Sequence, residues 1–224
     1  MIPREKVRKL LVHMSQWPFT PVIIFGFTGT NRKAIIHGVQ SLHPELEKVI
    51  SFTTRSPGYD EKQNQQHYFS KLGHFRQRTF VQGMKYVTET NCWYGTTVQE
   101  IVRVVKTGKT PLFVTSSTDV ILTVNYLCGS RAQVYKLDIP YATLYQNLVD
   151  RFQGDPDASI RINDCLHHYN RQHANLEDDY ELQSMITHSI PFNGRSGHEA
   201  VARTISDYLH VHSQSMEAPT LLSA

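Results

Sequence analysis

Residues 22–25, Val-Ile-Ile-Phe, form a short run without a polar side chain, and Gly26 and Gly29 follow it before a helical pattern over residues 34–42. An apolar run of this length without alternation is typical of a strand buried on both faces, as in a parallel sheet. A glycine-containing loop between such a strand and a helix leaves backbone N–H groups available to surround a phosphate. The sequence therefore predicts a phosphate-type loop, residues 26–33, that joins a central parallel strand to a helix.

Strands and helices are expected to alternate along the rest of the chain. The expected strands cover residues 49–53, 80–96, 111–115, 132–137 and 189–192, and the expected helices cover residues 97–107, 141–153, 159–175 and 197–211. Alternation of this kind predicts an α/β fold with a parallel sheet and helices on both faces. The polar, turn-rich middle of the chain, residues 50–96, is predicted to form a strand-rich insertion beside that sheet.

The chain is expected to form one domain with short flanking segments. Its 224 residues, of which 40% are hydrophobic, suffice for one sizeable core. Residues 18–212 are assigned to that domain, residues 213–224 to a flexible tail, and residues 1–17 to an amphipathic helix. The basic side chains of this helix would allow contact with an acidic membrane, although packing on the edge of the domain is the favoured interpretation.

Composition and charge argue against several classes of protein. A net charge of +3 is small for a dedicated nucleic-acid binder. No apolar run approaches the length of a transmembrane helix, and the N-terminus shows no signal-peptide pattern. Cys92, Cys128 and Cys165 are far apart and odd in number, which indicates reduced thiols and argues against a zinc site. We therefore expect a cytoplasmic protein without a bound metal ion.

The phosphate-type loop keeps two glycines but changes the residues that would carry the chemistry. Such loops use a lysine to reach the terminal phosphates and a Ser or Thr hydroxyl to hold magnesium. Here the third glycine position is Asn31, the lysine position is Arg32 and the hydroxyl position is Lys33. Arg32 is a planar cation and not a compact ammonium, and Lys33 cannot ligate magnesium. The loop is predicted to keep its shape without metal-dependent chemistry, so we assign no catalytic residue and no cofactor.

Three further segments complete an ordered set of motifs. They are Ser51-Phe52-Thr53-Thr54-Arg55-Ser56-Pro57, His67-Tyr68-Phe69 and Tyr94-Gly95-Thr96-Thr97. Together with the loop they resemble the guanylate kinase family over about residues 20–211. The altered loop is closest in character to the guanylate kinase-like domains of membrane-associated scaffold proteins. The resemblance implies a P-loop-type parallel sheet with a monophosphate-binding insertion, and it places Arg151 and Arg161 near the lid arginines of the family.

The chain departs from the family at positions that bind substrate or metal. The changed positions are Gly58 at a second phosphate-binding arginine, Asn147 at the first lid arginine, and Val114 and Ser116 at the acids after the central strand. Two alignments stay open. The phosphate-binding tyrosine falls on His67 or, with a slip of one residue, on Tyr68, and the guanine-reading acid falls on Gln82 or Lys85. Neither Gln82 nor Lys85 is acidic, so guanine preference is expected to be lost.

The groups that remain are suited to bind an anion. The resemblance places Ser51, Arg55, Tyr68, Tyr94 and Thr96 in one monophosphate-type pocket, with Arg55 as a bidentate anchor. In the scaffold relatives this pocket binds phosphorylated peptides. The resemblance therefore implies a non-catalytic domain with a protein partner, phosphorylated in one form of the hypothesis, and nucleotide binding that is weak or absent.

Three alternatives stay open at this level. Arg55 could be a surface residue that pairs with Asp60 or Glu61. The chain could instead be an active guanylate kinase that uses ATP, with Arg32 or Lys33 serving the loop. It could also be a nucleotide sensor that binds without turnover. Binding of ATP with magnesium would separate the active enzyme from the non-catalytic domain.

Overall fold

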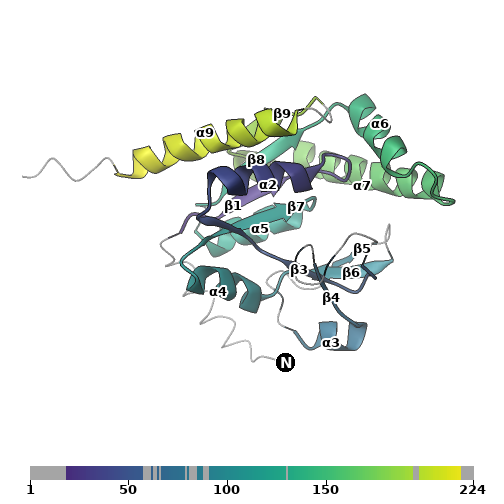
Figure 1. Cartoon of the computed structure of the whole chain (residues 1–224), viewed down its shortest axis with the longest axis horizontal. Helices are drawn as coiled ribbons and strands as arrows, with labels where there is room; N and C mark the ends of the chain where they lie inside the picture. The colour runs from purple at the N-terminus through teal and green to yellow at the C-terminus, as the bar shows by residue number, and fades with distance from the viewer. Residues whose placement is uncertain are drawn as a thin grey trace, which may run out of the picture.

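The computed structural model describes residues 19–217 except 58–61, 63–64, 66, 79, 81–84, 88–90, 130 and 194–196. Several residues named above lie outside the described residues: the expected helix over 1–17, Gly58, Asp60, Glu61, Gln82 and residues 218–224. In the described part, a main sheet and a smaller second sheet occupy different regions of the molecule (Figure 1).

The main sheet has five parallel strands in the order β2-β7-β1-β8-β9. Their bounds are β1 Val22–Phe25, β2 Leu46–Lys48, β7 Thr110–Thr115, β8 Gln133–Asp138 and β9 His188–Pro191. β1 lies at the centre, because Val22 pairs with Leu112 of β7 on one side and with Gln133 of β8 on the other. Every residue of β1 is buried, as a strand covered on both faces requires. The prediction of a central parallel strand at residues 22–25 is confirmed.

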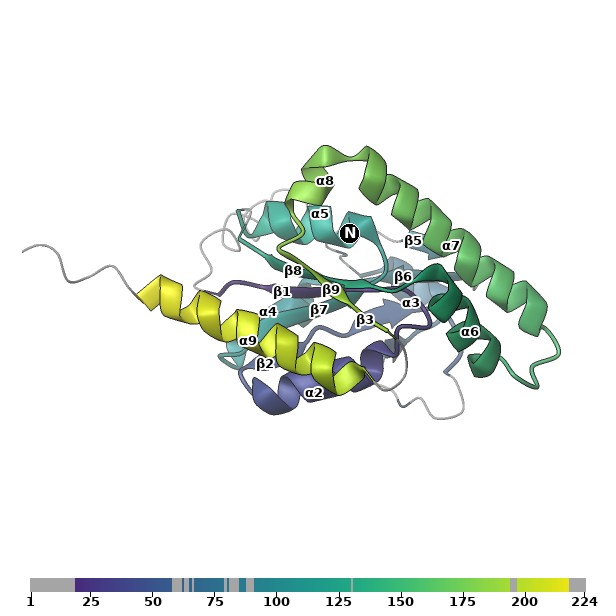
Figure 2. The same cartoon turned by 90° about the horizontal axis from the view of Figure 1, so that it is seen from above.

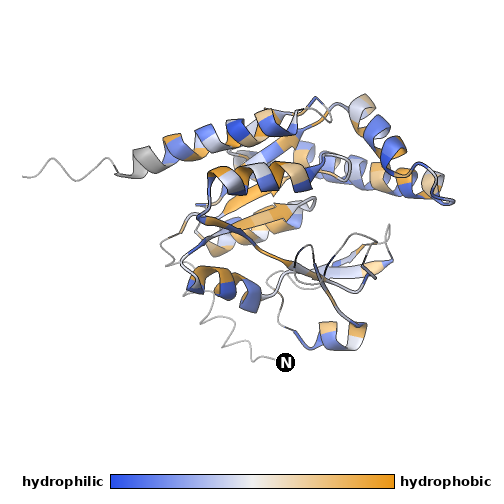
Figure 3. Cartoon of the chain, in the orientation of Figure 1, coloured by the Kyte–Doolittle hydropathy of each residue, from blue (hydrophilic) through white to orange (hydrophobic). Residues whose placement is uncertain are grey.

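Helices cover both faces of the main sheet. Figure 2 shows α2 (Arg32–Leu42) and α9 (His198–Glu217) on one side, and α5 (Thr118–Leu127) and α8 (Tyr180–Ser184) on the other. α6 (Tyr141–Arg151) and α7 (Ala158–Asp178) connect β8 to α8. Hydrophobic residues concentrate on the strands between these layers (Figure 3). α9 continues past residue 212, where we expected the domain to end, and no helix among the described residues is long and apolar enough to cross a membrane.

The second sheet has four strands in the order β4-β3-β6-β5 and lies where the insertion was expected. Its strands are β3 Ser51–Thr53, β4 His67–Phe69, β5 Lys85–Val87 and β6 Cys92–Gly95. β3 and β4 are parallel, whereas β6 is antiparallel to both β3 and β5. A short helix, α3 (Leu72–Arg76), follows β4, and α4 (Val98–Lys106) leads back to the main sheet.

The short elements β4, α3 and α8 were not expected, and two larger differences concern residues 49–53 and α5. The single strand expected at residues 49–53 is the junction between two strands, because the chain leaves the main sheet after Lys48 and enters the second sheet at Ser51. The Ile50 amide donates to the Glu100 carboxylate at 3.1 Å and not to a strand. Helix α5 has no counterpart among the expected elements. Its sequence is apolar around most of its circumference and rich in β-branched residues, so it lacks the one-sided period of a surface helix.

Candidate functional site

The loop between β1 and α2 has the backbone conformation that Gly29 and Asn31 allow. Gly29 has a φ of 100°, and Asn31, at the third glycine position, has a φ of 46° and a ψ of 40°. Asparagine adopts this left-handed region more easily than most residues that carry a Cβ. The turn is closed by Thr30, whose amide and hydroxyl both donate to the Phe27 carbonyl, at 3.2 and 2.7 Å. The loop therefore keeps its shape although Asn31 replaces a glycine.

Helix α6 packs directly on this loop. The Asn147 side-chain amide donates to the Gly29 carbonyl at 2.9 Å. A Cβ on Gly29 would lie 2.9 Å from Leu144 Cδ1, and Leu144 and Leu148 are fully buried against the loop. Glycine is thus required here both by its positive φ and by the close approach of α6. Asn147, at the expected position of the first lid arginine, holds α6 on the loop through a neutral hydrogen bond.

Two arginines lie beside the loop. Burial and the charge of Arg151 lower the pKa of Arg32 to about 10, so the Arg32 guanidinium stays charged at neutral pH. Among the described residues neither of them forms an ion pair, whereas Arg161 pairs with Asp155 at 3.2 Å. Arg151 and Arg161 both lie near the Phe152 ring, at 5.7 and 5.8 Å from its centroid. The structure brings Arg151 to the loop and ties Arg161 to a carboxylate.

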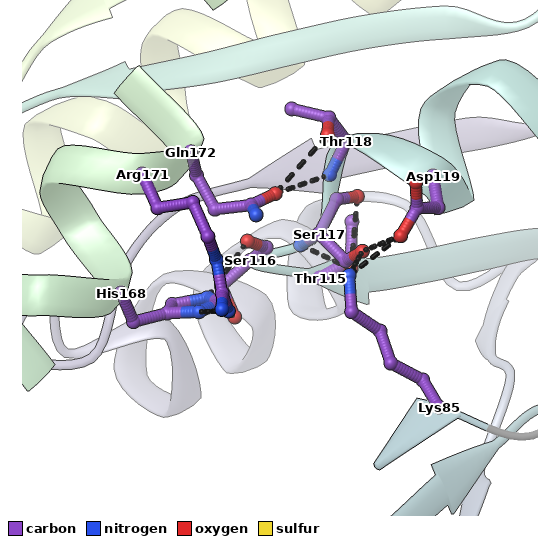
Figure 4. A network of polar contacts seen from close by, with 9 residues as sticks. All are labelled: Lys85, Thr115, Ser116, Ser117, Thr118, Asp119, His168, Arg171 and Gln172. Atoms are coloured by element: carbon purple, nitrogen blue, oxygen red, sulfur yellow. Dashed lines mark hydrogen bonds and ion pairs between the residues drawn. The ribbon is translucent and has the colours of Figure 1, made fainter. Parts of the chain in front are cut away.

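The end of β7 carries hydroxyls and cations where the family resemblance would place acids (Figure 4). Val114 packs against the core, and His168 Nε2 lies 3.1 Å from the Ser116 carbonyl oxygen and 3.2 Å from its hydroxyl. Arg171 donates to His168 Nδ1 at 3.2 Å, which places the imidazole proton on Nε2. His168 therefore donates its Nε2 proton to Ser116 and cannot act as a base toward the Ser116 hydroxyl. The described residues contain no group of three His, Cys, Asp or Glu side chains placed to hold a metal ion.

Lys85 of β5 connects the insertion to α5 at the same place. Its ammonium donates to Ser117 Oγ at 2.8 Å and to Asp119 Oδ2 at 2.5 Å. The Ser117 hydroxyl also donates to Asp119, at 3.2 Å. Partial burial acts to raise the pKa of Asp119, but the hydrogen bond and charge of Lys85, the Ser117 hydrogen bond and the charge of Arg171 together hold that pKa below its usual value. Lys85 and Asp119 are therefore an ion pair between the insertion and the main domain at neutral pH.

One face of the insertion sheet, which we call the inner face, gathers side chains around Tyr94. Thr53 pairs across the strands with both Phe69 and Tyr94, and Tyr94 pairs with Lys85. Arg55 Nε donates to the Tyr94 hydroxyl at 3.2 Å, and its guanidinium lies 5.4 Å from the centroid of the Phe69 ring. The Ser51 and Thr96 hydroxyls form a hydrogen bond of 3.0 Å with each other. The part of the inner face considered below includes Ser51, Thr53, His67, Phe69, Lys85, Tyr94 and Thr96, with Arg55 at its edge.

Comparison with known proteins bears on the fold. No protein-family model matches the sequence, and no curated protein matches it. Among solved structures, a guanylate kinase from Anaplasma phagocytophilum matches with a TM-score of 0.57 over 87% of this chain and 86% of that chain, at 15% sequence identity. This chain has a guanylate kinase-like fold. The α/β class with a parallel sheet and flanking helices is thereby confirmed.

In this guanylate kinase-like fold, His67 and not Tyr68 lies on the inner face. The Tyr68 ring is on the opposite side of the sheet, the outer face, where it stacks on Phe52 with centroids 4.4 Å apart. The His67 ring centroid lies 5.8 Å from that of Tyr94. This placement separates Tyr68 from the other residues expected to bind an anion, and it favours the alignment without a gap. The alternation of side chains along β4 is the signal that could have separated the two residues.

A buried carboxylate behind the outer face was not anticipated from the sequence. Glu100 is 3% exposed, and it accepts hydrogen bonds from the Tyr68 hydroxyl at 2.9 Å and from Arg103 Nε and Nη2 at 3.0 and 2.9 Å. Burial and the hydrogen bond to Glu100 raise the pKa of Tyr68. Arg103 also pairs with Glu47 of β2. This network, completed by the Ile50 amide, joins the insertion to α4 and to the main sheet.

Proposed function

We propose that this chain is a non-catalytic guanylate kinase-like domain that binds a phosphorylated segment of a protein partner at its inner face. The hydrogen bond of 3.2 Å from Arg55 to Tyr94 carries the proposal, because it holds a guanidinium fork beside a phenol. These two groups can donate to a phosphate without a metal ion, and the hydrogen-bonded pair of Ser51 and Thr96 has one further hydroxyl proton to offer. A cytoplasmic location belongs to the proposal, and the free thiols of the described cysteines fit a reducing compartment.

The residues at the loop and at the end of β7 support the absence of catalysis. Phosphoryl transfer depends on positioning the phosphates and neutralising their charge, usually with magnesium. Lys33 at the hydroxyl position would repel a divalent cation, and neither Val114 near the end of β7 nor Ser116 just after it is acidic. A coupled assay with ATP, magnesium and GMP should therefore show no turnover. Turnover on the order of 1 per second, the range of ordinary kinases, would overturn the proposal.

A binding experiment tests the anion site itself. The probe is a fluorescein-labelled alanine-based peptide with one phosphoserine, followed by fluorescence polarisation. Arg55→Ala should weaken binding about tenfold to a hundredfold, as expected when a hydrogen bond to a charged group is lost. Arg78→Ala is the matched control, because Arg78 lies over the Phe52 ring, at 4.1 Å from its centroid, on the outer face of the same sheet. Equal affinity of wild type and Arg55→Ala would refute the assignment.

A second candidate function, nucleotide binding without turnover, is favoured by the two arginines at the loop. Arg32 and Arg151 repel each other and have no ion pair among the described residues, so a polyphosphate would relieve both charges. Binding of this kind should not require magnesium, because Lys33 supplies no ligand. Calorimetry with ATP in EDTA, on wild type and Arg32→Ala, tests it. Absence of binding in EDTA would dismiss this candidate and leave the inner-face proposal unchanged.

A further inference from the structure

We propose that Lys85 is a second anchor for the ligand of the inner face, specific for a carboxylate two residues from the phosphorylated residue. We further propose that Asp119 competes with the ligand for this lysine. The inference rests on the proposed function and names the class of peptide that the site selects, a phosphopeptide with a nearby acidic side chain.

The position of Lys85 relative to the phosphate anchor supports this role. Lys85 and Tyr94 are direct cross-strand partners, and Arg55 donates to the Tyr94 hydroxyl at 3.2 Å. Directly paired side chains lie side by side on one face of an antiparallel pair. Arg55 and Lys85 therefore flank Tyr94 on the inner face. An extended peptide projects side chains i and i+2 to the same side, roughly 7 Å apart, which suits two anions that bind on either side of one tyrosine.

The contact between Lys85 and Asp119 shows that Lys85 is placed to bind a carboxylate. The lysine ammonium and the Ser117 hydroxyl both donate to the same carboxylate oxygen, at 2.5 and 3.2 Å. Arg171 contributes further positive potential at Asp119, and His168 lies beside it on α7. A ligand carboxylate in this place would meet the same donors. Of these two donors the Lys85 ammonium is charged, so a neutral amide in the ligand would lose the attraction between lysine and carboxylate.

A ligand carboxylate can replace that of Asp119 on Lys85 at a small cost in free energy. The Asp119 side chain is 58% exposed and that of Lys85 is 30% exposed, so the ion pair lies in contact with water. Exposed ion pairs contribute little to stability, and a rotation of Asp119 returns its carboxylate to solvent. A peptide already held by its phosphate presents its own carboxylate at high effective concentration. The competition predicts opposite effects for the two partners: loss of Lys85 weakens binding of the acidic peptide, and loss of the Asp119 charge strengthens it.

The test uses two labelled phosphopeptides that differ in one group, phosphoserine-Ala-Glu and phosphoserine-Ala-Gln in the same alanine-based frame. The wild type should bind the Glu peptide about three- to tenfold more tightly than the Gln peptide. Lys85→Met should abolish this preference, so that the Glu and Gln peptides bind it with equal affinity. Asp119→Asn should increase the affinity for the Glu peptide severalfold. Lys109→Met is the control, because Lys109 binds the Pro44 carbonyl at 2.8 Å, away from the inner face.

A charge-swapped variant, Lys85→Glu with Asp119→Lys, separates binding from folding. It keeps an ion pair between β5 and α5, so it should still unfold cooperatively with a melting temperature lowered only by the repulsion between the new lysine and Arg171, yet it should lose the preference for the Glu peptide. Equal affinity of the wild type for both peptides, with the Arg55 dependence intact, would overturn this inference and leave the proposed function standing. Failure of both peptides to bind would overturn both.

Discussion

Removing Arg103 should destabilise the protein far more than its place on the surface of α4 implies. The Arg103 side chain is 40% exposed, but its partner Glu100 is 3% exposed. In Arg103→Met the aliphatic part of the side chain is kept and the guanidinium is lost. The cost is then set by the environment of Glu100, which becomes a buried carboxylate without a cation.

The magnitude follows from what remains around that carboxylate. Breaking a buried ion pair by removing one partner costs about 3–5 kcal/mol. The Tyr68 hydroxyl and the Ile50 amide would still donate to Glu100, at 2.9 and 3.1 Å in the wild type. The lower end of the range therefore applies, and we expect a loss of about 3 kcal/mol in the free energy of unfolding. For a domain of this size that corresponds to a fall in melting temperature of about 6–12 °C.

Urea unfolding followed by circular dichroism measures the loss, with the m-value as a check that the transition stays two-state. The matched variant is Glu47→Gln, because Glu47 pairs with the same guanidinium while its side chain is 30% exposed. A partly solvated pair of this kind should contribute less than about 1 kcal/mol. If Arg103→Met is no more destabilised than Glu47→Gln, the buried carboxylate does not dominate and the reasoning fails.

Three further variants test other parts of the structure. Gly29→Ala should destabilise the protein by about 1–3 kcal/mol in thermal melts, because Gly29 has a positive φ. Gly73→Ala, at a helical site with open space, should stabilise the protein by about 0.5–1 kcal/mol. Equal effects of the two substitutions would refute backbone strain at residue 29. Burial and the charge of a neighbouring histidine lower the pKa of His188 below 6.5, so the unfolded chain binds more protons there and stability should fall as the pH drops through 6.5. In acid titrations, His188→Phe should lose less stability over that window, and a parallel pH profile would contradict this. Tyr68→Phe should lower stability by about 1 kcal/mol without changing phosphopeptide affinity, whereas Tyr94→Phe should weaken binding; weakened binding in Tyr68→Phe would return that residue to the site.

Local sequence patterns determined the parts of the fold whose contacts lie close together along the chain. The apolar run at residues 22–25 and the following glycines predicted a central strand, a loop and a helix, because burial on both faces and a left-handed turn each demand particular residues. The helices with one apolar face were predicted because their apolar residues recur at the helical period. α5 was not, because its sequence is apolar around most of its circumference and so has no distinctive period, although only one face is buried.

Only the tertiary structure decided which functional side chains meet. The sequence named Arg55 and Tyr94, 39 positions apart, but could not choose between His67 and Tyr68, since a slip of one residue in β4 exchanges the two faces. It also gave no signal that Lys85 would reach Asp119, or that Glu100 would be buried with Arg103. Strand pairing and the packing of the insertion on α4 and α5 fix these contacts. Those interactions join segments far apart in the chain, and no local pattern of residues records them.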